Sequence, residues 1–144
     1  MKKRIEITLH HLHLGSARQV VTLSIDGSNP AAKFLTKLQK KDSNAYRSLK
    51  TRIRTVAEYE HYENEETFRP LGDGLYEFKR NSPKLIRLYA FYDEIDGVGQ
   101  LIICTNGGDK RSQQQDITQA KAIRKAYLTA KELPNTTLTY EEPD

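Results

Sequence analysis

The chain of 144 residues has one cysteine, no tryptophan and no long apolar run. A single cysteine cannot form an internal disulfide, and Cys104 lies in the apolar run LIIC, where a buried thiol is expected rather than a nucleophile. Because no apolar run approaches the roughly 18–20 residues of a membrane span, and the first residues lack the apolar stretch of a signal peptide, we expect a cytoplasmic protein with no membrane partner.

The low hydrophobic fraction, 37%, does not indicate disorder. The chain still holds eight tyrosines, four phenylalanines and regular runs of isoleucine, leucine and valine. Its length is close to that of one domain, and no internal repeat or linker interrupts it. We therefore predict a single domain over residues 1–144.

Positive charge is concentrated in one part of the sequence. The net charge is +4, but eight cations and one anion, Asp42, fall between residues 33 and 54, whereas residues 58–66 hold five glutamates. Such a run is most often a solvated helix face, and the alternative is a surface for nucleic acid or for an acidic partner. The eight cations are Lys33, Lys37, Lys40, Lys41, Arg47, Lys50, Arg52 and Arg54.

Hydrophobic periodicity predicts two strands followed by two helices in the first half of the chain. Residues 4–14 and 19–25 alternate as strands do. Asn29 is suited to cap a helix that has Pro30 in its first position, and a second amphipathic helix follows a short turn near Asp42. Two helices joined so tightly are expected to pack as an antiparallel hairpin.

After Pro70 the period changes to two. Strands are predicted over residues 74–80, 84–93 and 98–104 as an antiparallel meander, and the last helix, over residues 112–133, should stop before Pro134. Since side chains alternate across a sheet, Arg87 should point away from the core that the helix hairpin covers, onto an open face.

The stretch NGGDKRSQQQD places Gly107 and Gly108 just before the cations Lys110 and Arg111. Glycines free the backbone to adopt positive φ, so the pair predicts a mobile turn between the sheet and the last helix. Such a turn could hold a phosphate, and the alternative is an ordinary solvated turn.

Histidines are the other conspicuous polar group, because His10, His11 and His13 lie within four residues. His11 and His13 would share one face of a strand, but no third ligand accompanies them at suitable spacing, so we predict no metal site and no cofactor. His61 is expected to lie at a solvated helix end.

Three segments resemble the RelE/ParE superfamily of bacterial toxins, in its phage-derived, HigB-like branch. They read RPLGDGLYEFKR, LIRLYAFYD and DKRSQQQD, and the resemblance covers residues 20–131. It implies an α+β, RelE-like fold, in which a helix hairpin and a C-terminal helix pack on a small antiparallel sheet. The additions would be an extra N-terminal strand within residues 1–18 and a polar tail over residues 134–144.

The resemblance implies a metal-independent endoribonuclease that cleaves mRNA, with or without the ribosome, by attack of a ribose 2′-hydroxyl on the adjacent phosphate. This reaction needs a proton acceptor, a proton donor and stabilisation of charge on the phosphate, a task that suits the planar fork of arginine. The matching catalytic residues are Arg87, Lys79, Glu77 and Tyr89, and the RNA-binding residues are Lys110, Arg111 and Arg80. An ordinary cross-strand ion pair is the alternative for Glu77 and Lys79.

The resemblance also implies a partner, an antitoxin that is a helix-turn-helix protein from a neighbouring gene. Two departures bear on activity, because glycines stand where the family usually has an aromatic residue before its basic pair, and Asp116 stands where it usually has proline. Two alternatives remain open, namely a ParE-like toxin that inhibits gyrase and a relative that binds RNA or protein without catalysis.

Overall fold

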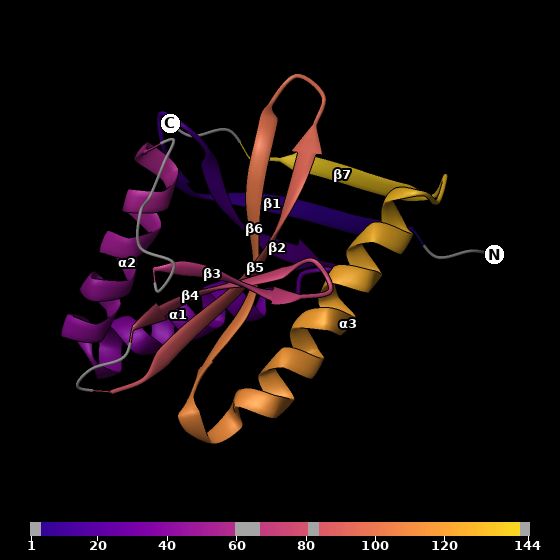
Figure 1. Cartoon of the computed structure of the whole chain (residues 1–144). Coiled ribbons are helices and arrows are strands. Elements are labelled where there is room, and N and C mark those ends of the chain that lie inside the picture. The colour runs from indigo at the N-terminus through magenta and orange to yellow at the C-terminus, as the bar shows by residue number, and fades with distance from the viewer. Residues whose placement is uncertain (1–3, 60–66, 81–83, 142–144) are drawn as a thin grey trace.

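The computed structural model describes residues 4–59, 67–80 and 84–141 (Figure 1). It is a mixed α+β structure with one seven-stranded sheet in the order β3-β4-β5-β6-β2-β1-β7. The β2–β6 and β1–β7 pairs are parallel and the others are antiparallel. Along the chain the elements are β1 (Ile5–Leu14), β2 (Gln19–Ile25), α1 (Pro30–Lys41), α2 (Ser43–Glu58), β3 (Phe68–Gly72), β4 (Leu75–Arg80), β5 (Ile86–Ile95), β6 (Gly99–Asp109), the 3₁₀ turn η1 (Lys110–Ser112), α3 (Gln113–Lys131) and β7 (Thr136–Tyr140).

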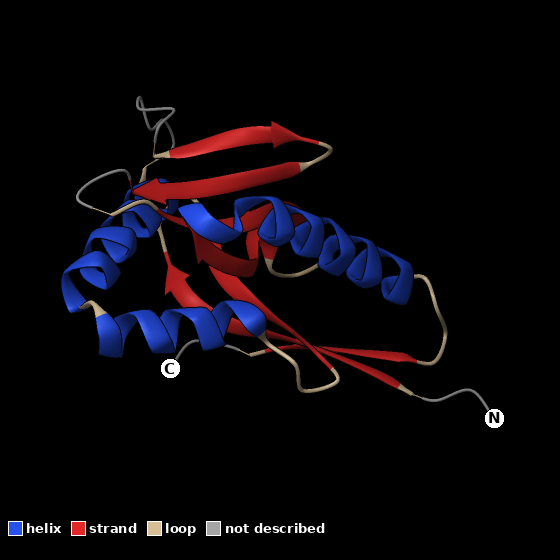
Figure 2. Cartoon of the chain, turned by 90° about the horizontal axis from the view of Figure 1, so that it is seen from below, coloured by secondary structure: helices blue, strands red, loops and turns tan. Residues whose placement is uncertain are grey.

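The predicted helix starts are confirmed. The side chain of Asn29 accepts a hydrogen bond from the Ala32 amide at 3.0 Å, and that of Asp42 accepts one from the Ala45 amide at 3.1 Å. Asp42 both ends α1 and begins α2. Because one residue connects the two helices, they lie at a wide angle to each other and not side by side (Figures 1 and 2). The expected antiparallel hairpin is therefore wrong.

Helices cover both faces of the central strands. On one face α1 and α2 pack against the alternate residues Leu88 and Ala90 of β5. On the other face α3 packs against Phe91 and Tyr89, which confirms the predicted alternation. The second face is therefore not open, and Arg87, which we expected to be exposed there, is only 5% exposed.

The sheet is larger than predicted because it includes two strands, β3 and β7, that the sequence did not predict. β3 pairs antiparallel with β4, and β7 forms within what was expected to be a polar tail. Leu138 and Tyr140 of β7 alternate with threonines and pack on the α3-side core, which explains why this polar segment pairs with β1. β1 thus lies between β2 and β7 and does not form the sheet edge.

The glycines of the LGDGL segment shape a tight hairpin. Gly72 pairs with Leu75, and the two residues between them, Asp73 and Gly74, have φ values of 54° and 80°. Positive φ at both central residues is typical of a type I′ turn, which matches the twist of the strands it connects. The LGDGL part of the segment RPLGDGLYEFKR therefore has a structural role in joining β3 to β4.

The prediction for Cys104 is confirmed, whereas other predictions fall on residues outside the described part of the chain. Cys104 is fully buried, and burial raises the pKa of its thiol, as expected for a structural cysteine. The acidic segment 60–66 with His61, and the turn at 81–83, lie outside the described residues. No helix in the described part of the chain has the length and apolarity to cross a membrane.

Candidate active site

Strand register brings polar side chains into two rows on the face that α3 covers. Across β3, β4, β5 and β6 the first row consists of residues that oppose one another, namely Arg69, Glu77, Tyr89 and Asn106. The second row is formed in the same way by Lys79, Arg87 and Gly108. A β-bulge after Tyr89 adds Thr105 to β6 and so sets Asn106 opposite that tyrosine. The four predicted catalytic residues are therefore neighbours.

Glu77 is the centre of the first row. It is fully buried, and its Oε1 accepts a hydrogen bond from Nε of Arg69 at 2.7 Å. Its Oε2 lies 3.1 Å from Nε of Arg87 without hydrogen-bond alignment. A buried carboxylate between two guanidinium groups is compensated in charge, so the ion pair expected as the alternative is present, but with arginines and not with Lys79.

Arg87 and Tyr89 retain unused hydrogen-bonding atoms. Nη1 of Arg87 and the hydroxyl of Tyr89 are buried and have no hydrogen-bond partner among the described residues. Buried polar atoms are usually paired, so unpaired ones in one small cluster point to a site that is completed by something else. Burial raises the pKa of Tyr89 to about 12, against the nearby charge of Arg87, so the phenol is protonated at neutral pH.

The start of α3 covers these rows. The side-chain amide of Asn106 donates to the backbone carbonyl of Asp116 at 3.0 Å and to Oε1 of Gln119 at 3.3 Å. The hydroxyl of Ser112 donates to Oδ2 of Asp116 at 2.6 Å. These few hydrogen bonds hold η1 and the first turns of α3 over Tyr89.

Gly107 and Gly108 are packing glycines, and the predicted mobile turn is wrong. Both lie inside β6, and neither has a positive φ. A Cβ on Gly108 would lie 1.8 Å from Oδ2 of Asp116, and one on Gly107 would lie 2.3 Å from the ring of Phe34. Each glycine therefore admits a side chain from a different face, Phe34 from α1 and Asp116 from α3.

Lys110 and Arg111 are exposed at η1, where the sheet meets the last helix, as predicted. Arg111 forms an ion pair with Asp109 at 3.0 Å, and its side chain is 84% exposed. Lys110 takes part in no ion pair within the described residues. Beside them lies a pocket of about 330 Å³ whose cations are Lys37, Lys41, Lys84 and Arg111.

Lys79 and Arg80 separate onto opposite faces of β4. Lys79 is half-buried next to Arg87 and forms no ion pair among the residues that the structure describes. Arg80 is only 6% exposed and lies on the α2 side of the sheet. Desolvation lowers the pKa of Arg52 on α2, and the nearby charge of Arg80 lowers it further. Arg80 therefore lies on the face opposite to the polar rows, and its contact with RNA stays a prediction.

The histidines of β1 contact carboxylates on separate elements. His13 lies 2.9 Å from Glu58 at the end of α2, and His10 lies 2.9 Å from Glu141 after β7. Within residues 4–59, 67–80 and 84–141 no cluster of three or more metal-ligating side chains occurs.

Comparison with known proteins relates the central part of the chain to one family. Residues 33–131, more than half of the chain, match the family described as phage derived protein Gp49-like (DUF891). The chain belongs to this family. Gp49-like proteins belong to the RelE/HigB-type toxins, which are associated with toxin–antitoxin systems. No curated protein and no solved structure matches the chain.

The match to the Gp49-like family contains every residue of the two rows. The sequence pointed to the four catalytic candidates and to Gly108, but not to Arg69 or Asn106. Arg69 is the first residue of the segment RPLGDGLYEFKR, and Asn106 directly precedes the two glycines, so both lay in or beside features already singled out. Neither has a residue type that signals a role without knowledge of the strand register.

Proposed function

We propose that this Gp49-like protein is the toxin of a toxin–antitoxin pair and cleaves RNA without a metal ion. The single observation that carries the proposal is the juxtaposition of Arg87 and Tyr89, each with an unused polar atom, on neighbouring positions inside the family-matched region. The substrate would be mRNA, with or without the ribosome, and the cell compartment would be the cytoplasm.

Three residues of the rows suit the steps of the reaction. The ribose 2′-hydroxyl attacks the adjacent phosphorus, the bond to the 5′-oxygen breaks, and a 2′,3′-cyclic phosphate and a 5′-hydroxyl result. Arg87 would stabilise the charge that develops on the phosphate through its free Nη1. Tyr89, protonated at neutral pH, would donate a proton to the leaving oxygen, and Oε2 of Glu77 would accept the proton of the nucleophile.

Access to these groups requires that their cover move. Glu77 and Tyr89 are fully buried under the start of α3, so a phosphate reaches them only if η1 and the first turns of α3 shift. Asn106 supplies two of the hydrogen bonds that would break. Lys79, Lys110 and Arg111 would then contact the RNA backbone at the rim of the opened site.

A binding protein without catalysis is the second candidate. The observation that favours it is the burial of Glu77 between Arg69 and Arg87, which is how a purely structural ion-pair network is built. In that case the antitoxin and any RNA would bind to the outer surfaces alone. An antitoxin with an acidic segment would suit the cations of α1 and α2, and such a complex should weaken as salt is added.

Cleavage assays separate the two candidates. Purified protein is incubated with mRNA alone in the presence of a chelator, and with mRNA and ribosomes in a magnesium buffer, and fragments are separated by size. The proposal expects cleavage in at least one condition, and intact RNA in both would favour the binding protein. A gyrase supercoiling assay on the same preparation tests the ParE-like alternative.

A further inference from the structure

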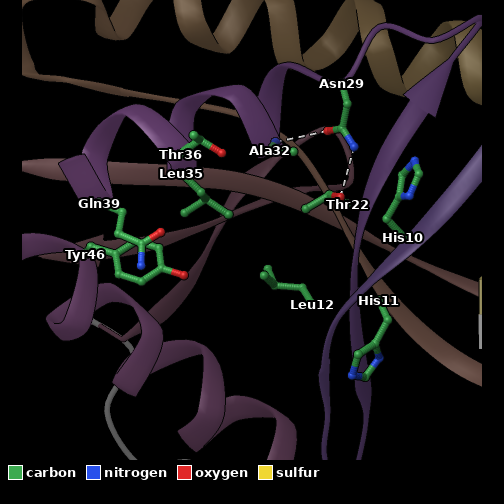
Figure 3. Close-up of a pocket in the computed structure, with 10 residues that line it drawn as sticks. All are labelled: His10, His11, Leu12, Thr22, Asn29, Ala32, Leu35, Thr36, Gln39 and Tyr46. Carbon is green, nitrogen blue, oxygen red and sulfur yellow. Dashed lines mark hydrogen bonds between the residues drawn. The ribbon is translucent and has the colours of Figure 1, made fainter. Parts of the chain in front are cut away.

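Two adjoining pockets run between strand β1 and the helices α1 and α2. Their volumes are about 360 Å³ and 410 Å³, and Tyr46 of α2 lines both. Figure 3 shows the first: His10 and His11 lie on the strand side, Thr36 and Gln39 on the helix side, and Leu12 points between them. We call the two pockets together the β1 groove.

No carboxylate lines the β1 groove among the described residues. Its second pocket is lined by the cations Arg47, Lys50 and Arg54 together with His13. Arg47 and Arg54 are exposed, whereas Lys50 is partly buried and its Nζ lies 3.4 Å from the backbone carbonyl of Leu12, which ties β1 to α2. Groove walls that carry only one sign of charge attract a ligand of the opposite sign.

Carboxylates do approach the groove from outside. Glu58 pairs with His13 and Glu141 pairs with His10, so these two histidines are already engaged. The two exposed arginines form no ion pair within the described residues, and the guanidinium of Arg47 donates a hydrogen bond to Asn44, one turn away on α2. The positive charge available to a ligand therefore comes from Arg47 and Arg54.

The first pocket differs from the second and supplies neutral polar groups. The amide of Gln39 and the hydroxyl of Thr36 offer both donors and acceptors, and the half-buried ring of Tyr46 lies where the two pockets meet. Nucleobases present donors, acceptors and a flat face that stacks on aromatic rings, whereas the carboxylates of an acidic peptide segment would use donors alone and would not stack. A neutral pocket beside a cationic pocket fits a base beside the phosphates of the same strand.

We propose that the β1 groove binds a single strand of RNA, with phosphates on Arg47 and Arg54 and a base against Tyr46. The choice of RNA as ligand rests on the proposed function. The groove itself is distinct from the Arg87 rows, and its strand wall, β1, precedes residue 33, where the family match begins. It would hold a part of the RNA that is not being cleaved.

Binding to a labelled 2′-O-methyl RNA of mixed sequence tests this inference, because that RNA lacks the nucleophile and cannot be cleaved. Fluorescence anisotropy is measured over about 50 to 200 mM salt. Arg47→Gln/Arg54→Gln should weaken binding and reduce the slope of log K against log salt by about 1.4, or about 0.7 for each lost phosphate contact. Tyr46→Leu should weaken binding at least fivefold, roughly the loss of one stacked base, and should leave the salt slope unchanged.

The matched control removes the same charge outside the groove. Lys40→Gln/Lys125→Gln alters two exposed lysines that line neither pocket, and it should change the salt slope less than the arginine pair does. Equal effects of the two double variants would overturn the proposal. The proposal would also be overturned if binding of a polyglutamate peptide depended on Arg47, Arg54 and Tyr46 while binding of RNA did not. The groove would then fit an acidic protein segment.

This outcome is separate from that of the cleavage assay. If the protein fails to cleave RNA but binds the 2′-O-methyl strand through the groove, the proposed function falls and the groove stands. If it cleaves RNA and the arginine variant binds as the parent does, the groove falls alone.

Discussion

Tyr89 is the residue that best separates a catalytic row from a structural one. Its hydroxyl is buried and has no partner among the described residues, so the fold gains no hydrogen bond from it. Tyr127 is a natural counterpart, since it is equally buried but donates a hydrogen bond to Asp93 at 2.5 Å. The two tyrosines should therefore respond in opposite ways to the loss of the hydroxyl.

Tyr89→Phe should change the free energy of unfolding by less than about 1 kcal/mol, because no hydrogen bond is broken. It should lower RNA cleavage by about 10² to 10⁴, the usual contribution of a general acid. Tyr127→Phe should instead destabilise the protein by about 1.5 to 3 kcal/mol and leave cleavage per folded molecule unchanged. Chemical denaturation and cleavage rates check both, and a fully active Tyr89→Phe would remove this tyrosine from the mechanism.

At the scale of elements, the end of β6 and the start of α3 fit together through Gly108. The carboxylate of Asp116 occupies the space where a side chain at position 108 would be. The glycine pair is thus explained by close packing between strand and helix. This packing also positions the cover of the candidate site.

Gly108→Ala should destabilise the protein by about 1 to 3 kcal/mol, since the added methyl group displaces Asp116. Asp116→Ala in the same chain should relieve the clash, so the free energies of unfolding of the two single variants should fail to add by about 1 kcal/mol or more. Gly107→Ala is the control, because it meets Phe34 and should gain nothing from Asp116→Ala. Additive effects at position 108 would contradict the packing described.

Local signals predicted most elements and failed where tertiary contacts decide. Asn29 and Asp42 cap helices through their own side chains, and alternation in β5 sets its two faces, so these could be read from short segments. The strand β7 could not, because it owes its conformation to pairing with β1, far away in sequence. Glycines likewise look the same in a sequence whether they permit motion or close approach.

The same limit applied to the site. Period-two alternation could place Glu77, Lys79, Arg87 and Tyr89 on one face, but it could not show that α3 covers that face. The covering helix has a weak apolar stripe, and its start holds polar residues such as Asp116, whose carboxylate is buried in the space that Gly108 leaves open. Exposure was therefore predicted wrongly where proximity was predicted well.

At the scale of the whole molecule, segments outside the family match are integral to the fold. Ile7 and Leu9 of β1 are fully buried in the core that includes Tyr127 of α3.

Asp93 of β5 contacts the same end of α3, because it accepts hydrogen bonds from Tyr127 and from Lys131, the latter at 2.7 Å. The sheet and the C-terminal helix are thus tied by one carboxylate at the end of α3 away from the candidate site.

The hydrogen bonds to Asp93 should make the free energy of unfolding depend on pH. Burial acts to raise the pKa of Asp93, but the hydrogen bonds from Lys131 and Tyr127 outweigh it, so the pKa is lowered. A lowered pKa gives stabilisation that is complete above the ordinary value of about 3.9 and is lost as pH falls through the folded-state value. Asp93→Asn should therefore be less stable than the parent at neutral pH, with a difference that shrinks below about pH 4.

Unfolding by denaturant across this pH range measures the effect. Asp96→Asn serves as the control, because Asp96 is exposed in the turn after β5 and should have little influence at any pH. If the difference in free energy of unfolding between the parent and Asp93→Asn stayed constant down to low pH, the ionised carboxylate would not be what stabilises this contact.

The ends of the RNA fragments test the central claim most directly. RNA incubated with the protein in chelator is analysed for terminal groups, for the parent and for Arg87→Lys, which keeps the charge beside Glu77 and loses the guanidinium fork. We expect a 2′,3′-cyclic phosphate and a 5′-hydroxyl at each cut, and slower cleavage by the lysine variant, which should lose about 2 to 4 kcal/mol of transition-state stabilisation. Fragments with 5′-phosphate ends, or an Arg87→Lys protein that cleaves as fast as the parent, would contradict it.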